Sequence, residues 1–74
     1  MKAHFTPALY DDLNVLLDST IAARGIVNIP LLAEQVRLRN EDANIALEDI
    51  AAELMRRALA RNALMEFDTA GSLN

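Results

Sequence analysis

Three segments of the chain carry apolar residues at the spacing of an α-helix, and this periodicity limits the fold more than any other feature. In the first segment the apolar residues recur every three or four positions, so they share one side of a helix. They are Leu9, Leu13, Leu16, Leu17 and Ile21. Thr6 is a suitable N-cap, Pro7 suits the first helical position, and Gly25 predicts the end of the helix.

Two further helices follow from the same spacing. Pro30 is expected to open one that reaches about Arg39. Its apolar face consists of Leu31, Leu32, Val36 and Leu38. The other is expected to run from about Ala46 to Arg61, and Asn62 should end it because asparagine tolerates a left-handed backbone. Its apolar arc consists of Leu47, Ile50, Ala51, Leu54, Met55 and Ala58, with Leu59 at the margin.

Residues 26–29 and 64–67 have the character of short strands. The first segment is rich in β-branched side chains, and the second partly alternates between polar and apolar. Their pairing would give a two-strand β-ribbon beside the helices. The sequence therefore predicts a mainly α fold, a small three-helix domain over residues 1–68 with a possible ribbon, and a flexible C-terminal tail over residues 69–74.

Composition narrows the classes of function. With 74 residues the chain forms one domain at most, yet 53% of its residues are hydrophobic. That is more apolar surface than one small core hides, which favours self-association or a partner. The net charge of −4 argues against an overall affinity for nucleic acid or anionic membranes. The absence of cysteine excludes thiolate metal sites, and no signal-peptide or membrane-spanning pattern is visible, so a cytoplasmic protein is expected.

The stretch RNEDANIALED, residues 39–49, holds four of the eleven acidic residues. A calcium-binding EF-hand loop starting at Asn40 would need glycine at its sixth position and glutamate at its twelfth. Ile45 and Ala51 stand there instead. The acidic stretch is better explained as the start of the third helix, with Asn40 or Asn44 as the cap and Glu48 near the positive end of the helix. No metal or cofactor is expected.

The segment IPLLAEQV, residues 29–36, resembles the first helix of a helix-turn-helix motif. The expected order of strands and helices is also similar to that of winged-helix proteins. This resemblance implies DNA binding or transcription regulation through a local arginine patch. The candidate residues are Arg37, Arg39, Arg56, Arg57 and Arg61. Two features depart from the motif: the connection of residues 39–45 is long and lacks glycine, and Glu48 and Asp49 open the presumed recognition helix, where carboxylates repel phosphates.

Catalysis has little support in the sequence. His4 is the only histidine, and Ser19, Thr20 and Ser72 have no evident base to activate their hydroxyls. No glycine-rich phosphate loop occurs. The chain is therefore not expected to be an enzyme or to bind a small-molecule substrate.

The remaining signal is apolar surface outside the main helical stripe. Ala8, Val15 and Ala22 recur every seven residues on the side of the first helix away from Leu13, with Ser19 beside them. Small residues let another helix approach closely, and Leu59 is a further candidate. The sequence thus predicts a non-enzymatic protein–protein interaction module that homodimerises through apolar helix surface, with Val15, Ser19, Ala22 and Leu59 as the interaction residues.

Overall fold

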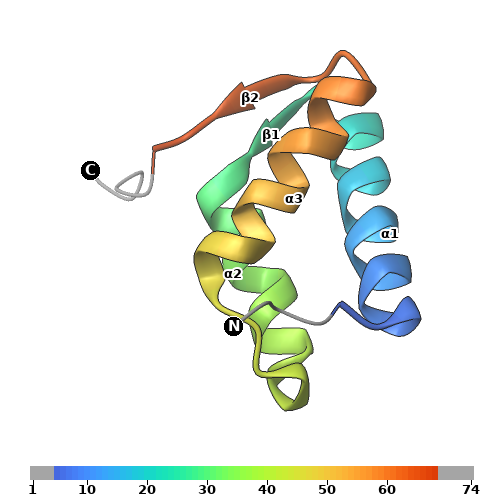
Figure 1. Cartoon of the computed structure of the whole chain (residues 1–74). Coiled ribbons are helices and arrows are strands. Elements are labelled where there is room, and N and C mark those ends of the chain that lie inside the picture. Colours follow the sequence, from blue (N-terminus) through green and yellow to red (C-terminus); the bar gives the residue numbers. More distant parts are fainter. Residues whose placement is uncertain (1–4, 69–74) are drawn as a thin grey trace.

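The computed structural model describes residues 5–68 and confirms the mainly α fold, a small three-helix domain with a short two-strand sheet. The elements follow in the order α1 (Pro7–Arg24), β1 (Ile26–Asn28), α2 (Ile29–Arg39), the 3-10 turn η1 (Glu41–Ala43), α3 (Leu47–Ala60) and β2 (Leu64–Glu66). In Figure 1, α1 and α3 run in the same direction and the strands lie at the end where both helices finish. His4 and the predicted tail over residues 69–74 lie outside the described residues.

Both ends of α1 are as the sequence predicts. The hydroxyl of Thr6 accepts a hydrogen bond from the backbone N–H of Leu9 at 3.1 Å. The rings of Phe5 and Tyr10 stack at 5.3 Å across this helix start. At the other end Gly25 adopts a left-handed backbone (φ 76°) and its N–H donates to the carbonyl of Ile21. Local signals therefore fix the length of α1.

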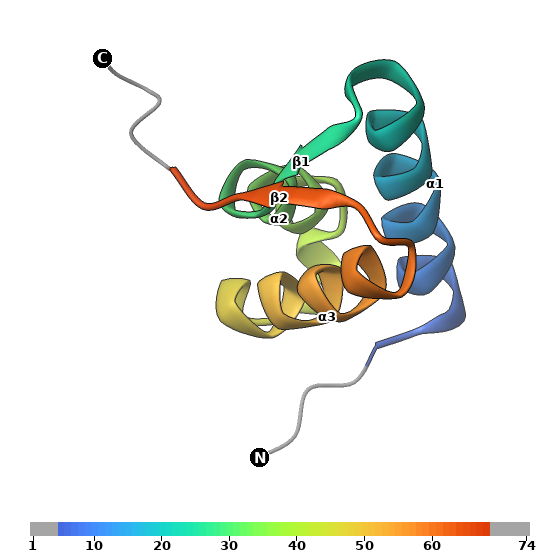
Figure 2. The ribbon, with the colours of Figure 1, turned by 90° about the horizontal axis from the view of Figure 1, so that it is seen from above.

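The two strands are parallel, a direction that the sequence leaves open. Ile26 pairs with Leu64, Val27 with Met65 and Asn28 with Glu66. Because α1 and α3 run side by side and each leads into a strand at the same end, the strands must also run in the same direction. The segment α2–η1–α3 then serves as the crossover that any parallel pair requires. Figure 2 shows the strands lying across α2, with α1 beyond one end of the strands and α3 alongside them.

The beginning of α2 differs from the prediction by one residue. The helix starts at Ile29 and not at Pro30, because Asn28 caps it: the side-chain oxygen of Asn28 accepts from the N–H of Leu31 at 3.2 Å. Leu31 and Leu38 were expected on the apolar face, but both are exposed. The face of α2 that meets the core is instead formed by Leu32, Ala33 and Val36.

The two ends of α3 behave differently. Neither Asn40 nor Asn44 caps the helix as predicted; the N-cap is Ala46, which offers no side-chain acceptor. Asn44 instead has a left-handed backbone (φ 54°) that closes η1. At the C-terminal end, Asn62 is left-handed (φ 56°) as predicted. The N–H of Ala63 donates to the carbonyl of Ala58, the long bond of a Schellman motif.

The core lies where the three helices and the strands meet. Its buried members are Leu9, Leu13, Leu17, Val27, Ile29, Leu32, Ala33, Val36, Ile45, Ile50, Leu54 and Ala58. No polar or charged residue among those described is buried with them. Within residues 5–68, no helix is both long and apolar enough to cross a membrane.

Candidate functional site

An apolar groove of about 420 Å³ lies between α2 and α3 and is closed at one side by the residue that follows β2. Its lining, here called the α2–α3 groove, consists of Ile29, Pro30, Ala33, Leu47, Glu48, Ala51, Met55 and Phe67. Glu48 is the only polar member. The sheet and core fix the positions of α2 and α3, so this hollow is formed by the packing of the domain itself.

The groove is open because the apolar arc of α3 is wider than the core requires. Ile50, Leu54 and Ala58 form the buried row of this helix. A second apolar row lies beside it, with one member every four residues, a step of about 40° around the helix. This row, the α3 strip, consists of Leu47, Ala51, Met55 and Leu59. Leu59, the last member of the strip, is 63% exposed.

Asn28 positions the aromatic side of the groove. Its side-chain amide donates to Glu66 at 3.3 Å and to the backbone carbonyl of Asp68 at 3.0 Å. These two bonds hold the chain on either side of Phe67. The phenyl ring lines the groove while remaining 55% exposed. Such an exposed aromatic beside an apolar hollow is typical of a binding surface.

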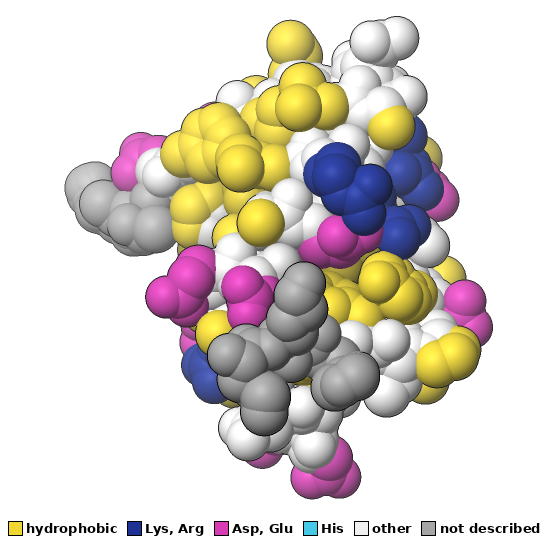
Figure 3. Space-filling view, viewed as in Figure 1, with side chains coloured by type: hydrophobic (Ala, Val, Ile, Leu, Met, Phe, Trp, Pro, Cys, Tyr) yellow, Lys and Arg dark blue, Asp and Glu magenta, His cyan; other side chains and the backbone are white. Residues whose placement is uncertain are grey.

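The margin of the groove is acidic. Glu48 lines it directly and Asp49 follows on α3. Among the described residues neither carboxylate forms an ion pair. Within residues 5–68, Glu66, next to Phe67, accepts only from the neutral amide of Asn28. Figure 3 shows a group of hydrophobic side chains at the upper left of this face, with acidic side chains at its left edge and below it.

The interaction residues predicted on α1 lie on a separate surface. Val15 is 64% exposed and Ala22 is also exposed, on the side of α1 away from buried Leu13. The hydroxyl of Ser19 donates to the carbonyl of Val15 at 2.8 Å, so the side chain leaves no unpaired hydrogen-bond donor on this surface. Arg57 reaches Asn14 of α1. Leu59 follows it by two residues, about 200° around the helix, so it lies on the side of α3 away from α1. The structure therefore divides the four predicted residues between two surfaces.

The five predicted arginines do not form one patch. Asp12 and Asn14 flank Leu13 on α1 and point to opposite sides of that helix. Arg39 pairs with Asp12 on one side, whereas Arg57 and Arg61 donate to Asn14 on the other. Arg37 pairs within α2 with Glu34. Only three of the arginines, Arg56, Arg57 and Arg61, gather along α3, where dark blue side chains cluster in Figure 3.

Each arginine of that cluster already faces a carboxylate. Glu53 accepts from Arg56 and from Arg57, and Asp18 accepts from Arg61 at 2.6 Å. The hydrogen bond from Arg56, with help from Arg57, lowers the pKa of Glu53 below its ordinary value against the opposing effect of burial. The guanidinium of Arg57 also lies over the ring of Tyr10, 4.8 Å from its centre. The contacts of Arg57 and Arg61 connect α1 to α3. The charges of all three arginines are therefore paired with carboxylates within the fold.

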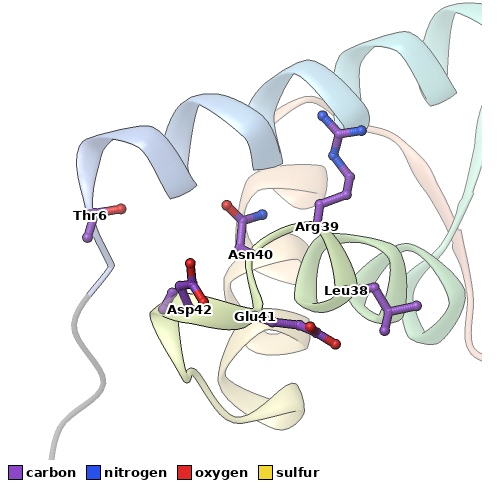
Figure 4. Close-up of a pocket in the computed structure, with 7 residues that line it drawn as sticks. Thr6, Leu38, Arg39, Asn40, Glu41 and Asp42 are labelled. Carbon is purple, nitrogen blue, oxygen red and sulfur yellow. The ribbon is translucent and has the colours of Figure 1, made fainter.

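A polar hollow of about 520 Å³ lies beside the turn that follows α2 (Figure 4). Arg39 and Asn40 line it, but both donate to Asp12, Arg39 in a bidentate pair with distances of 2.9 and 2.7 Å. The arginine lowers the pKa of Asp12 against the effect of burial. Thr6 is occupied as the cap of α1. Arg39, Asn40 and Thr6 are therefore already occupied, and the other polar side chains of the hollow are the carboxylates of Glu41 and Asp42.

The acidic stretch forms no metal site in the described structure. Glu41 and Asp42 lie in η1 and Glu48 in α3, and no three candidate ligand side chains in the described part of the chain come together. Within the same part, every buried side-chain nitrogen or oxygen has a hydrogen-bond partner.

Most of the groove was missed by sequence reasoning. The sequence predicts Phe67 only as the last residue of a short strand, and Met55 only as part of the apolar arc of the third helix. The available signal was the excess width of the α3 arc, which had placed Leu59 at its margin. Comparisons of the chain with family models, with curated proteins and with solved structures gave no match, so the function is inferred from the residues and geometry described above.

Proposed function

We propose that this protein is a small, non-enzymatic protein–protein interaction module that binds through the α2–α3 groove and the α3 strip. The observation that carries the proposal is the second apolar row of α3, which continues from the groove to exposed Leu59 beyond the needs of the core. Covering apolar surface stabilises a complex by about 25 cal/mol per Å². Phe67 and Met55 offer the aromatic and adaptable contacts that binding surfaces favour.

Homodimerisation through α1 is the second part of the proposal. Val15 is exposed between small residues, and the hydroxyl of Ser19 is turned back onto its own helix. Two copies of this stripe can therefore approach closely, with Ala22 at the contact. An interface of this kind would be symmetric, with the same patch used on both chains.

Sedimentation velocity over a dilution series, from about 500 µM to about 1 µM, tests the dimer. We expect the wild-type chain to shift toward the monomer on dilution and the Val15→Glu variant to remain a monomer throughout. Ala23→Glu is the matched control, since it adds the same charge to an exposed position of α1 outside the stripe. A wild-type monomer at every concentration would remove homodimerisation from the proposal. Weakening by Leu59→Glu instead would move the dimer contact to α3.

A further inference from the structure

We infer that the occupant of the α2–α3 groove is a basic amphipathic helix supplied by a different protein. The inference rests on the proposed interaction function and names the chemistry of its partner. It follows from three features of the groove: the charge at its margin, the repulsion that a second copy would meet, and the length of the apolar strip.

The ion pairs of the domain leave carboxylates at this margin without a cationic partner among the described residues. Arg37, Arg39, Arg56, Arg57 and Arg61 are all matched to carboxylates elsewhere in the fold. Glu48 and Asp49 have no such partner among the described residues, and Glu66 meets only an amide. Arg56 is the cation nearest the strip on α3, and Glu53 balances it. Lysine or arginine side chains of a partner would therefore find carboxylates beside the groove.

A second copy of this chain suits the groove poorly. Each copy carries a net charge of −4, and a symmetric contact here would bring the Glu48 and Asp49 margins of both copies together. Like charges set against each other at an interface are costly and exclude unsuitable partners. The groove thus discriminates against self-association.

The shape of the surface favours a helix over an extended strand. From Leu47 to Leu59 the α3 strip extends about 18 Å, at 1.5 Å per residue, which matches three to four turns of a partner helix. Strand addition at β2 would have only the three residues Leu64–Glu66 to pair with. An amphipathic helix instead offers apolar residues at i, i+3, i+4 and i+7 to a groove of this kind.

Fluorescence anisotropy with labelled synthetic peptides tests the inference on the full chain. The probe is an amphipathic helical peptide of about five turns, with leucine on one face and lysine on the other. Matched peptides carry glutamine or glutamate in place of lysine, and a scrambled peptide keeps the composition but disperses the leucines. We expect the lysine peptide to bind at least about tenfold more tightly than the others. Raising the salt from about 0.05 M to about 0.5 M should weaken its binding.

Variants locate the binding on the protein. Phe67→Ala should weaken the lysine peptide roughly tenfold, with Leu38→Ala, at an exposed apolar position of α2 outside the groove, as the matched control without effect. The double variant Glu48→Gln/Asp49→Gln should lower affinity and flatten the salt dependence. Asp11→Gln, an exposed acidic position on α1 that has no ion pair among the described residues, is its control. All five altered positions are exposed, so folding is retained and can be verified by circular dichroism.

Several results would overturn the inference, and they are distinguishable. Equal binding of the lysine and glutamine peptides, lost in Phe67→Ala, would keep the groove as an interaction site but refute a basic partner. If the scrambled peptide bound as tightly as the lysine peptide, net charge alone would account for the binding. Binding that appears only after residues 69–74 are deleted would assign the groove to this chain's own end. Loss of a wild-type dimer in Phe67→Ala would assign it to a second copy. If no peptide binds the full chain or the chain that lacks residues 69–74, the proposed binding function of the groove is wrong.

Discussion

Gly25 links α1 to β1 through a left-handed backbone, and this conformation makes the residue hard to replace. A Cβ atom at this position would meet nothing within 4 Å, so space is not the constraint. The cost of a side chain there comes from the backbone alone, because the φ of 76° is unfavourable for residues with a Cβ atom.

We therefore expect Gly25→Ala to lower the free energy of unfolding by about 1–2 kcal/mol. Gly25→Asn should lower it less, because asparagine tolerates the left-handed region better. Urea unfolding followed by circular dichroism at 222 nm gives both values. Equal stability of the alanine variant and the wild-type protein would show that the turn relaxes out of the left-handed region.

Asp12 predicts a dependence of stability on pH. The hydrogen bonds from Arg39 and then Asn40 favour the charged carboxylate and hold its folded pKa below the ordinary value of 3.8. A lowered folded pKa contributes stability that is fully present above the unfolded value and is lost as the pH falls through the folded value. We expect Asp12→Asn to destabilise the protein at pH 7 by more than it does at acid pH.

The measurement is the difference in the free energy of unfolding between wild type and Asp12→Asn at several pH values. This difference should be constant at neutral pH and shrink as the pH falls below about 4. Asp11→Asn serves as the control because the carboxylate of Asp11, beside Asp12, has no ion pair among the described residues. If this difference in the free energy of unfolding did not change with pH, Asp12 would act through its shape and not through its charge.

At the scale of elements, α3 begins without a side-chain cap. Ala46 has the extended backbone of an N-cap residue (φ −64°, ψ 144°) but no oxygen to accept from the first turn. The residue is exposed, so a larger side chain has room. We expect Ala46→Ser to raise the free energy of unfolding by about 0.5–1 kcal/mol, because its hydroxyl can accept from the N–H of Asp49.

Thermal and urea unfolding compare this variant with Ala52→Ser, which places the same residue at an exposed position inside α3. Serine is a weaker helix former than alanine, so the control should be slightly destabilised. The opposite order of the two variants would exclude capping as the cause.

The helix ends show how far local sequence determines the elements. Thr6, Gly25 and Asn62 each act through their own backbone and nearest turn, and their predicted roles are confirmed. The start of α2 was misplaced because Asn28 serves two purposes, capping the helix and ending the strand. Leu31 was misassigned since its burial depends on what packs against α2, and helical periodicity alone does not carry that information.

At the scale of the whole molecule, the groove required information that the sequence does not hold locally. Pro30 and Phe67 are far apart in the chain and meet only because β1 and β2 pair in parallel. The direction of that pair depends on α1 and α3 running side by side. Once that arrangement is known, the extra apolar row of α3 becomes visible as surface. Without knowledge of that arrangement, Met55 could equally well be assigned to the core or to the surface.

The arrangement of the arginines leads to a final prediction, about DNA. All five candidate residues are paired with carboxylates, and α1 separates Arg39 from the cluster on α3. Binding to a duplex would require breaking these pairs, and the net charge of −4 opposes it. We expect fluorescence anisotropy with a labelled duplex to show no salt-dependent binding by the wild-type protein, even at about 0.05 M salt.

A variant can test whether the pairing is the cause. In Asp18→Asn/Glu53→Gln the three arginines Arg56, Arg57 and Arg61 lose their carboxylate partners but keep hydrogen-bonding neighbours of similar shape. Because phosphate contacts depend on unneutralised cations, we expect weak binding to appear in this variant and to fall with increasing salt. Wild-type binding that is lost in Arg56→Ala/Arg57→Ala would contradict the prediction. It would show that the same arginines can leave Glu53 for phosphate, and that the cluster joining α1 to α3 is also a nucleic-acid surface.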